Sequence, residues 1–490
     1  MIRRGRMSEQ VDTLIVGSGF AGLGAAIRLD GAGRRDWLML EKAETLGGTW
    51  RDNVYPGCAC DVESHLYSFS FFPNDDWSRT FARQAEIRAY LEDVADHYRL
   101  RDRIRFGAHV TGAEWDGAAW DVTLADGTLL RARYVVFGTG ALHEPSVPEI
   151  EGLEEFAGTA FHSAQWDHGT DLRGKRVAVI GTGASAIQFV PAIAPETEHL
   201  TLFQRTAPWV LPKPDKPIRE RTRRAFRRVP GLRRAYRTAL YWRHEAMVVG
   251  FMHPRIMKLA ERAARLYLRR TFAGDPELRR KVTPDFTMGC KRVLMSNDYY
   301  PALRRDDVSV ETTGIDRITA RGVVTTDGVE HPCDVIVFGT GFRVGDGMSR
   351  MAITGRDGVK LADAWRDGPQ ALHGTTVSGF PNLFAVVGPN TGLGHSSMVL
   401  MIESQLNYVL DAMELVDRNR VVAIDTRAEV QDAHNADLQD RLGAAVWGSG
   451  GCASWYLDEH GRNRTLWPGY TFTFRNRTRR ADPAAHELVA

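Results

Sequence analysis

Two glycine-rich turns constrain the fold of this chain more than any other feature. The first is Gly17-x-Gly19-x-x-Gly22, which follows an apolar strand that begins at Val11 and opens a helix. The second is Gly181-x-Gly183-x-x-Ala186, which follows a strand that begins at Lys175. Glycines at these places let the backbone turn tightly and approach a pyrophosphate, and the helix N-terminus supports the negative charge. The two turns therefore predict two dinucleotide sites.

The residue that ends the next strand indicates which nucleotide each site takes. After the first turn, the strand Trp37–Leu40 leads to Glu41, an acid placed to accept hydrogen bonds from a ribose 2′-OH. After the second turn, a strand ends at Arg205, a cation that favours a 2′-phosphate and hence NADP; the alternative is a solvated charge. We predict one FAD site and one NADPH site. The residues assigned are Gly17, Gly19, Phe20, Ala21, Gly22, Glu41 and Lys42 for FAD, and Thr182, Gly183, Ala184, Ser185, Gln188, Arg205 and Thr206 for NADPH.

Two later strands, Tyr134–Phe137 and Asp334–Phe338, also open into glycine turns, as expected where the chain crosses between two nucleotide domains. The predicted fold is therefore α/β, with two nested Rossmann-like dinucleotide-binding domains. We place the FAD-binding domain at residues 1–145 and 326–490, and the NADP-binding domain at 146–325. A helical insertion at about 212–282 belongs to the second domain.

The insertion is rich in arginine and has helical spacing. Its arginines include Arg219, Arg221, Arg223, Arg224, Arg227, Arg228, Arg233, Arg234, Arg237, Arg269 and Arg270. One interpretation is a patch for a membrane surface or nucleic acid. The favoured one is a solvated helical cap over the active site, whose apolar residues face a channel or core. Those residues are Leu240, Tyr241, Trp242, Met247, Val248, Val249, Phe251 and Met252.

The overall composition predicts a soluble, cytoplasmic protein. Apolar residues make up 43% of the 490 residues, and the formal net charge of +2 gives no general attraction to nucleic acid or membrane. No apolar run follows Met1–Met7, so no signal peptide is predicted, and either Met1 or Met7 is the start. The segment 397–416 is interrupted by polar residues, which indicates a buried helix and not a membrane span.

The cysteines argue against thiol chemistry. Their odd number and spacing indicate a reducing cytosol, not a disulfide scaffold, and no metal site is predicted. They are Cys58, Cys60, Cys290, Cys333 and Cys452. A disulfide reductase needs two exchanging cysteines near its flavin, and the spacing of Cys58 and Cys60 is too short for an unstrained pair. A reductase is therefore the weaker hypothesis, and a monooxygenase the stronger one.

The segment just before the second glycine turn separates the remaining flavoenzymes. It matches FxGxxxHxxxW followed by Pro or Asp, through Phe156, Gly158, His162, Trp166 and Asp167. The chain thereby resembles the type I Baeyer–Villiger monooxygenases, and the similarity extends over nearly its whole length. The resemblance implies an enzyme that uses NADPH and O2 to convert ketones to esters or lactones through a C4a-peroxyflavin and a tetrahedral adduct. The alternative on the same fold is an N- or S-oxidising flavin-containing monooxygenase.

The same resemblance assigns the catalytic pair. It makes Arg292 the cation that stabilises the oxygenating anion, and Asp61 the carboxylate that holds the guanidinium in place. Lys291 is expected to reach the NADP 2′-phosphate together with Arg205. On the residues alone, Arg292 and Asp61 read as an ordinary surface cation and turn acid, because the sequence does not show that they are adjacent.

Further residues receive supporting roles. The flavin is expected to contact Gly48, Thr49, Trp50, Asp61, Tyr67, Val110, Gly140 and Met398. The five fingerprint residues are expected to govern how the NADP domain moves and not to act as acids or bases. The expected partners are a ketone and O2, without nucleic acid or a membrane span, in a monomer or small homo-oligomer. A third hypothesis, from another class, is a regulatory flavoprotein that binds membrane or nucleic acid through the insertion.

Overall fold

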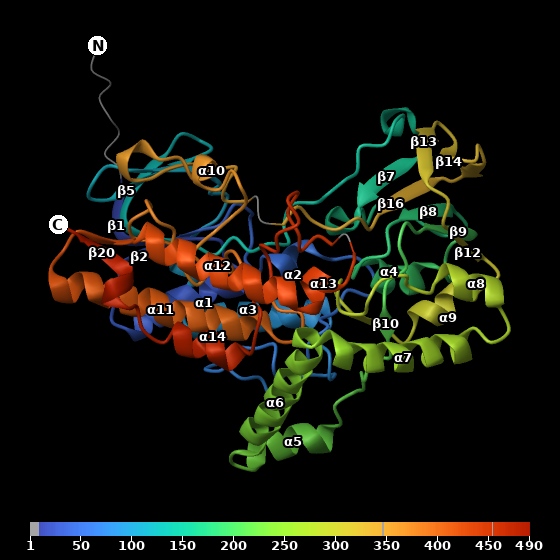
Figure 1. The fold of residues 1–490 in the computed structure, drawn as a ribbon, viewed down its shortest axis with the longest axis horizontal. Helices are drawn as coiled ribbons and strands as arrows, with labels where there is room; N and C mark the ends of the chain where they lie inside the picture. The colour runs from blue at the N-terminus through green and yellow to red at the C-terminus, as the bar shows by residue number, and fades with distance from the viewer. Residues whose placement is uncertain (1–8, 345–346, 453) are drawn as a thin grey trace.

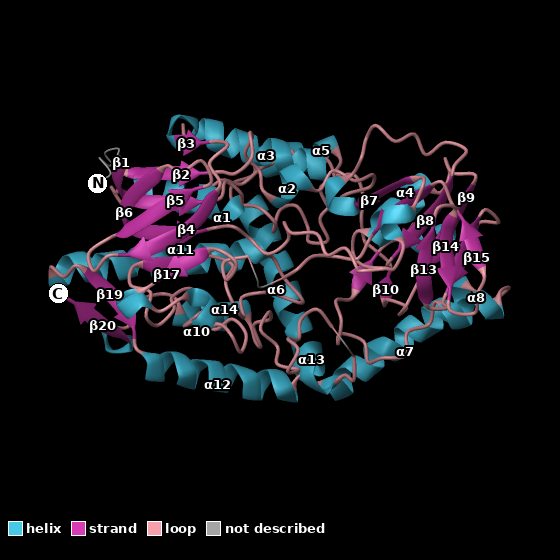
Figure 2. Ribbon diagram, turned by 90° about the horizontal axis from the view of Figure 1, so that it is seen from above, coloured by secondary structure: helices cyan, strands magenta, loops and turns pink. Residues whose placement is uncertain are grey.

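Two sheets organise the chain, and each contains one of the glycine-rich turns. The computed structural model describes residues 9–344, 347–452 and 454–490, so the choice between Met1 and Met7 as the start lies outside the described residues. The sheets lie at opposite ends of the molecule, with helices between and around them (Figure 1, Figure 2). This arrangement is the predicted α/β fold with two nested Rossmann-like domains, and it is confirmed.

The first sheet has the order β17-β4-β5-β6-β1-β2-β3, with β18 paired to β6. Its central strand β1 (Glu9–Val16) pairs in parallel with β2 (Trp37–Leu40) and β6 (Leu129–Phe137). Leu14 and Ile15 are fully buried, as expected for a parallel strand covered on both faces. The other strands are β3 (Ile104–Arg105), β4 (Val110–Trp115), β5 (Trp120–Leu124), β17 (Ala352–Thr354) and β18 (Leu383–Ala385).

The second sheet has the order β12-β9-β8-β16-β7, and all its pairings are parallel. Its strands are β7 (Thr159–His162), β8 (Arg176–Ile180), β9 (His199–Phe203), β12 (Val308–Glu311) and β16 (Val335–Phe338). A three-stranded sheet adjoins it, formed by β13 (Ile315–Thr319), β14 (Gly322–Thr325) and β15 (Glu330–Pro332). Because β16 belongs here, the chain returns to the first sheet only after Phe338. The boundary that we expected between residues 325 and 326 therefore lies too early, because β15 and β16 follow it and still belong to the second domain.

The two domains repeat one local arrangement. Gly138, after β6, donates its N–H to Val16 O over 2.8 Å, and Gly339, after β16, donates to Ile180 O over the same distance. From these two glycines the chain crosses between the domains, as the matching glycine turns predicted. The crossing segments contact each other, because Ser146 N donates to Gly341 O over 2.9 Å. The two domains are therefore joined by a double connection.

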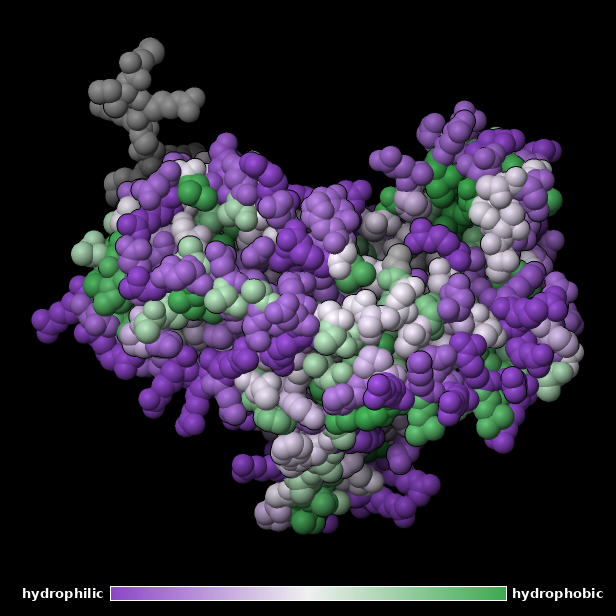
Figure 3. Space-filling view, in the orientation of Figure 1, coloured by the Kyte–Doolittle hydropathy of each residue, from purple (hydrophilic) through white to green (hydrophobic). Residues whose placement is uncertain are grey.

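The insertion is helical in the structure. It comprises α5 (Glu220–Arg228), α6 (Leu232–Met252), α7 (Pro254–Thr271) and α8 (Pro276–Lys281), between the short paired strands β10 (Val210–Leu211) and β11 (Leu294–Met295). Leu240, Val248 and Phe251 are buried, as expected for a helix that covers a core. Trp242 and Met247 are 56% and 47% exposed, so the expectation that they face a channel or core is wrong. The helix α6 projects from the body with α5 (Figure 1), and polar and apolar residues mix on the surface of this projection (Figure 3).

Long helices near the C-terminus cover the first sheet. The helix α11 (Met398–Asn419) packs against α1 (Phe20–Gly31) and is largely buried, as the polar interruptions of segment 397–416 predicted. None of the described helices is long and apolar enough to cross a membrane. The remaining elements are α2 (Thr49–Asp52), α3 (Gln84–His97), α4 (Ala186–Ile193), α9 (Tyr299–Leu303), α10 (Leu361–Ala364), α12 (Ala428–Ala444), α13 (Val446–Ser449), α14 (Thr471–Arg477), β19 (Ala423–Thr426) and β20 (His486–Val489).

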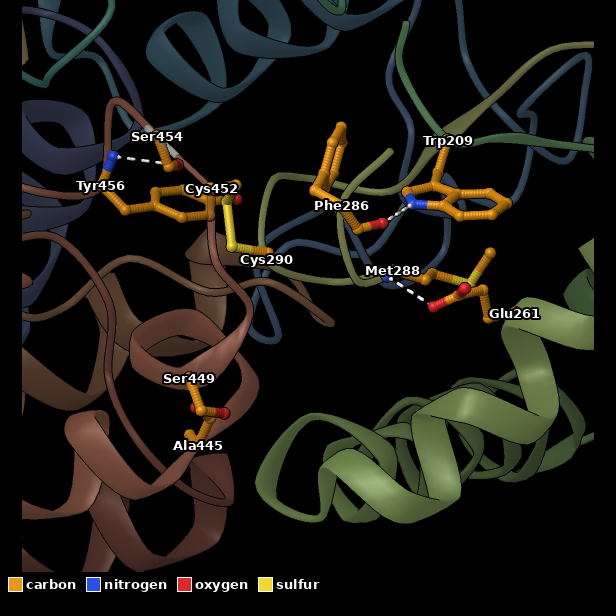
Figure 4. The surroundings of a disulfide bond; sticks show 10 residues. All are labelled: Trp209, Glu261, Phe286, Met288, Cys290, Ala445, Ser449, Cys452, Ser454 and Tyr456. Carbon is orange, nitrogen blue, oxygen red and sulfur yellow. Dashed lines mark hydrogen bonds between the residues drawn. A yellow bond between two sulfur atoms is a disulfide. The ribbon is translucent and has the colours of Figure 1, made fainter. Parts of the chain in front are cut away.

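One disulfide joins Cys290 and Cys452, which are 162 residues apart (Figure 4). The expectation that the cysteines do not pair is therefore wrong for these two. Their spacing in the sequence gave no sign of the pairing, because it arises only where the loop after α8 meets the loop after α13. The other three cysteines are free and buried. Burial raises the pKa of Cys58 to about 11 and that of Cys60 to about 12, so both stay neutral thiols near pH 7.

Candidate active site

The first glycine turn is packed so closely that two of its positions have no room for a side chain. A Cβ atom on Gly22 would lie 1.8 Å from Gly17 O, and one on Gly17, whose φ is +99°, would lie 2.8 Å from Gly138 O. Gly19 caps α1 without a side-chain hydrogen bond, so the first N–H groups of the helix remain available to an anion. Phe20 and Ala21 form the buried first turn of this helix. The site thus fits the pyrophosphate of FAD.

Glu41 lies at the end of β2, where the ribose acid was predicted. One oxygen, Oε2, accepts from Ser18 N at 3.0 Å and Ser18 Oγ at 2.6 Å, and Oε1 accepts from Ala43 N at 3.0 Å. Arg51 Nη1 is 2.8 Å from Oε1. Burial would raise the pKa of Glu41, but these donors and the charge of Arg51 outweigh burial and lower it. Glu41 is therefore an ionised acceptor that the turn itself holds in place.

Several predicted flavin contacts lie together near the first turn. Gly48, the residue before α2, approaches Gly19 so closely that a Cβ on it would lie 3.2 Å from Gly19 Cα. Thr49 begins α2, and Trp50 in the same helix donates through Nε1 to Tyr67 Oη over 3.1 Å. The Tyr67 ring also packs edge-on against Phe20, with centroids 5.1 Å apart. This cluster links segment 47–67 to the first glycine turn.

The other predicted flavin residues lie at separate places. Lys42 follows β2 and Gly140 follows β6, so both are at the same edge of the parallel strands as the glycine turn. Val110 is buried at the start of β4, two residues after Ala108, whose N–H donates to Glu41 O. Met398 is half-buried at the first position of α11, whose cap is Ser397.

The structure brings Asp61 and Arg292 together from positions 231 residues apart in the sequence. Arg292 donates to Asp61 Oδ2 through Nε at 2.8 Å and through Nη2 at 2.6 Å. Its Nη1 donates to Leu393 O over 3.2 Å. The side chains of Arg292 and Asp61 are 28% and 31% exposed, so the pair is open on one side to a small molecule.

The pair is fully charged. The Asp61 carboxylate raises the pKa of Arg292 above its already high value. Burial would raise the pKa of Asp61, but the charge and hydrogen bonds of Arg292 outweigh burial and lower it. Lys213 adds to the positive potential, since its Nζ donates to Cys60 O, next to Asp61, over 2.9 Å. The arrangement can hold a fixed cation against an anionic group that forms in the open space.

The second glycine turn has the same construction as the first. A Cβ on Gly181, whose φ is +108°, would lie 2.5 Å from Gly339 O. Thr182 Oγ1 donates to Thr206 O over 3.0 Å, and Gly183 and Ala184 are exposed just before α4. Ser185 is the N-cap residue of α4 and makes no capping hydrogen bond through its side chain. These residues leave an open cradle for a second dinucleotide.

Gln188 makes contacts that its predicted role did not include. Its Oε1 accepts from Tyr55 Oη at 3.1 Å and Ala59 N at 3.2 Å, and its Nε2 donates to Ala59 O at 3.0 Å. The side chain therefore fastens α4 of the second domain to segment 55–59 of the first. The glycine turns can be recognised in the sequence, but the contact of Gln188 with Tyr55 and Ala59 cannot.

Arg205 and Lys291 lie close to each other, as the 2′-phosphate assignment requires. Burial lowers the pKa of Lys291, and the charge of Arg205 lowers it further. Within the described part of the chain, Arg205 has neither a hydrogen bond nor an ion pair through its side chain. An anion placed between these two cations would be attracted by both, and no carboxylate of the described residues competes for Arg205. The pair fits a ribose phosphate.

The fingerprint residues lie where the chain enters the second domain. Gly158 precedes β7, and a Cβ on it would lie 2.3 Å from Asp334 O. Phe156 packs against the core on that side of the sheet. His162 is buried, its Nδ1 accepts from Ala164 N at 3.1 Å, and its ring packs edge-on against Phe342 in the returning connection. Burial lowers the pKa of His162, so the ring is neutral near pH 7.

The other two fingerprint residues stabilise the same region. The Trp166 ring packs against Phe161 in β7 and Phe189 in α4, with centroids 5.2 and 5.5 Å apart. Asp167 accepts from Gly169 N at 2.8 Å and Thr170 Oγ1 at 2.6 Å, which closes the turn that follows. The fingerprint residues therefore contact one another's neighbourhood in β7, α4 and the turn that follows Trp166.

Some residues of the site were missed from the sequence. Lys213 follows β10 in a proline-rich stretch and resembles any solvated lysine. Tyr456 is buried in the loop after the disulfide, close enough to Arg292 for that cation to lower the Tyr456 pKa, although burial raises it more. Leu393 contributes only a backbone oxygen, which no side-chain pattern reveals. None of these has a local sequence signal.

Comparison with known proteins agrees with this geometry. The family model for pyridine nucleotide-disulphide oxidoreductases matches residues 14–237. A curated Baeyer–Villiger monooxygenase of Pseudomonas aeruginosa is 52% identical over 97% of this chain and 91% of its own. A crystal structure of cyclohexanone monooxygenase from Rhodococcus sp. Phi1 bound to NADP⁺ matches with 31% identity and a TM-score of 0.86, over 99% of this chain and 100% of that one. The structure of OTEMO in complex with FAD and NADP matches with 28% identity and a TM-score of 0.87, over 96% and 97%.

The fold and the two nucleotide sites define a flavoprotein monooxygenase that uses FAD and NADPH. Within that class, the chain belongs to the Baeyer–Villiger monooxygenase family. The predicted family, activity class and cofactors are thereby confirmed. The neutral, buried thiols of Cys58 and Cys60 agree with the absence of disulfide exchange from this activity.

Proposed function

We propose that the Asp61–Arg292 pair is the centre at which this chain oxygenates ketones to esters or lactones. When bound, FAD and NADPH supply the electron transfer and the activation of O2. Arg292 provides a fixed positive charge for the anion that attacks the carbonyl carbon, and for the oxyanion that follows. Asp61 holds the guanidinium in one orientation through two hydrogen bonds.

The single observation that supports this proposal is that ion pair. It spans both domains, since Asp61 lies in the first and Arg292 in the second, and it stays partly exposed. A catalytic cation has to be both fixed in place and accessible to the reacting molecule, and Arg292 meets both conditions. We assign Arg205 and Lys291 to the NADP 2′-phosphate, and the cluster around Trp50 to the flavin. The fingerprint residues, by their place at the junction, are assigned to domain positioning.

The test uses purified holoenzyme with NADPH, O2 and a panel of cyclohexanone, 2-decanone and acetophenone. Products are identified by mass spectrometry and compared with the NADPH consumed. Ester or lactone in proportion to NADPH supports the proposal. Oxidation of thioanisole or N,N-dimethylbenzylamine without any ester would instead indicate an S- or N-oxidising enzyme. We further propose a cytoplasmic monomer or small homo-oligomer, since NADPH is an intracellular reductant; light scattering of the purified protein measures its mass.

A further inference from the structure

Two side chains, Arg292 and His244, each connect the same two segments of the FAD-binding domain, here called the flavin domain. In the first, Arg292 joins Asp61 to the backbone oxygen of Leu393. In the second, His244 joins a carboxylate two residues after Asp61 to a backbone oxygen two residues after Leu393. Both bridges therefore run from segment 61–63 to segment 393–395. Each has a carboxylate at one end and a carbonyl group at the other.

The second bridge is formed by Glu63, His244 and His395. His244 Nε2 is 2.6 Å from Glu63 Oε2, and His244 Nδ1 contacts His395 O. Glu63, His244 and His395 are 2%, 6% and 5% exposed, so all three are shielded from water. Unlike the first bridge, this one is closed to small molecules and cannot contact substrate.

Each of the two contacts in the bridge needs a hydrogen. The carbonyl oxygen of His395 only accepts hydrogen bonds, so Nδ1 of His244 carries a hydrogen. Nε2 then faces a carboxylate oxygen, and this contact is favourable only if a proton lies on the imidazole or on the carboxyl group. A buried pair without that proton would set two acceptors against each other at hydrogen-bond distance, which is costly.

The bridge also crosses between domains. His244 lies in α6 of the insertion, whereas Glu63 and His395 belong to the flavin domain. Its two neighbours in α6 contact the same domain: Arg243 pairs with Glu63, and Glu245 accepts from Thr471 N over 3.0 Å. Three consecutive residues of one helical turn therefore fasten the insertion to the flavin domain beside Arg292.

We propose that His244 and Glu63 are positioning residues that keep Asp61, Arg292 and the 393–395 backbone in register. The proposal rests on the proposed function of Arg292. With the bridge broken, segments 61–63 and 393–395 separate from α6, and Arg292 loses the fixed geometry of its partners. The reaction then releases hydrogen peroxide in place of ester, while hydride transfer from NADPH, which does not need Arg292, continues.

The test compares three variants of the holoenzyme. His244→Phe keeps an aromatic ring but removes both hydrogen bonds, and His244→Leu, which also removes both, serves if the phenylalanine variant does not fold. Glu63→Gln keeps both bonds, because its amide can donate to a neutral Nε2 while Nδ1 still donates to His395 O. Met247→Gln, exposed on the same helix, is the matched control. The readouts are ester formed per NADPH, the anaerobic rate of flavin bleaching, and hydrogen exchange of segment 388–397 without substrate.

For His244→Phe we expect ester per NADPH to fall about fivefold or more, with bleaching within about twofold of wild type. Exchange in segment 388–397 should accelerate about tenfold. Met247→Gln should match wild type in all three. Glu63→Gln keeps the His244 bridge and loses only the charge that pairs with the half-exposed Arg243, so it should stay within about twofold of wild type. Unchanged coupling and exchange in His244→Phe would overturn the proposal, as would a loss in Glu63→Gln equal to that in His244→Phe. If wild type forms no ester from any ketone, the proposed function fails, but the exchange data still decide the role of the bridge.

Discussion

Arg292 donates through two different nitrogens, Nε and Nη2, to one oxygen of Asp61. With the third bond, from Nη1 to Leu393 O, the described protein groups engage three of the five N–H donors of a guanidinium. The side chains of the pair are 28% and 31% exposed, so part of the guanidinium is accessible to a ligand. The geometry is that of a cation held by the protein and offered to a ligand.

Removing the Arg292 cation should abolish oxygenation of the ketone while leaving reduction of the flavin by NADPH largely intact. For Arg292→Ala we expect anaerobic bleaching of the flavin by NADPH within about threefold of wild type, and ester formation lower by about 100-fold or more. Stopped-flow absorbance and product analysis measure the two rates. Arg269→Ala, exposed on α7, is the control. Substantial ester formation by Arg292→Ala would remove Arg292 from the mechanism.

The 2′-phosphate assignment predicts a cofactor-specific loss. Arg205→Ala should raise the KM for NADPH by about 10- to 100-fold and change that for NADH by less than about threefold, because only NADPH carries the phosphate. Lys291→Ala should act in the same direction. Initial rates of NADPH and NADH oxidation provide the comparison. Equal losses with both cofactors would contradict the assignment.

The first glycine turn should tolerate no Cβ at its most crowded position. Gly22→Ala places a carbon 1.8 Å from Gly17 O, so we expect a protein that folds poorly or retains little FAD. Gly31→Ala is the matched control at the end of the same helix, where a Cβ would meet nothing within 4 Å. The absorbance ratio of flavin to protein measures the effect. A fully loaded Gly22→Ala protein would show that the turn relaxes more than its packing indicates.

The disulfide should contribute to global stability. Cys290 and Cys452 close a long loop, and removing such a crosslink costs about 2–5 kcal/mol in the free energy of unfolding. We expect Cys452→Ser to lower Tm, and a dithiol reductant to lower Tm of wild type by a similar amount. Calorimetry measures both. Since the variant has no bond to reduce, its Tm should not respond to the reductant; a response would place the effect at another site.

Asp425 should make stability depend on pH. Burial raises its pKa to about 6, above the ordinary value of about 3.9. The folded protein therefore binds more protons than the unfolded chain between these values, so stability falls as pH rises from about 4 to about 6. Asp425→Asn, which still accepts from Gly379 N, should raise Tm by a few degrees near pH 7.5 and have little effect near pH 4. An equal gain at both pH values would exclude this carboxyl group as the cause.

Sequence alone determined the features that depend on neighbouring residues. A tight turn from a strand into a helix needs glycine at set positions, so the order Gly17, Gly19, Gly22 and its second copy predict both nucleotide domains. The residue that ends the next strand is also close in sequence to each turn. Glu41 after the first turn and Arg205 after the second therefore predict which ribose each site binds. The fingerprint placed the chain in its family by resemblance.

Only the tertiary structure decided which distant groups meet. Asp61 and Arg292 lie 231 residues apart, and their contact depends on how the two domains dock. The same docking joins Cys290 to Cys452 and places His244 between Glu63 and His395. No local pattern encodes such contacts, because each is favourable only after the cores of both domains have packed and excluded water from the space between them.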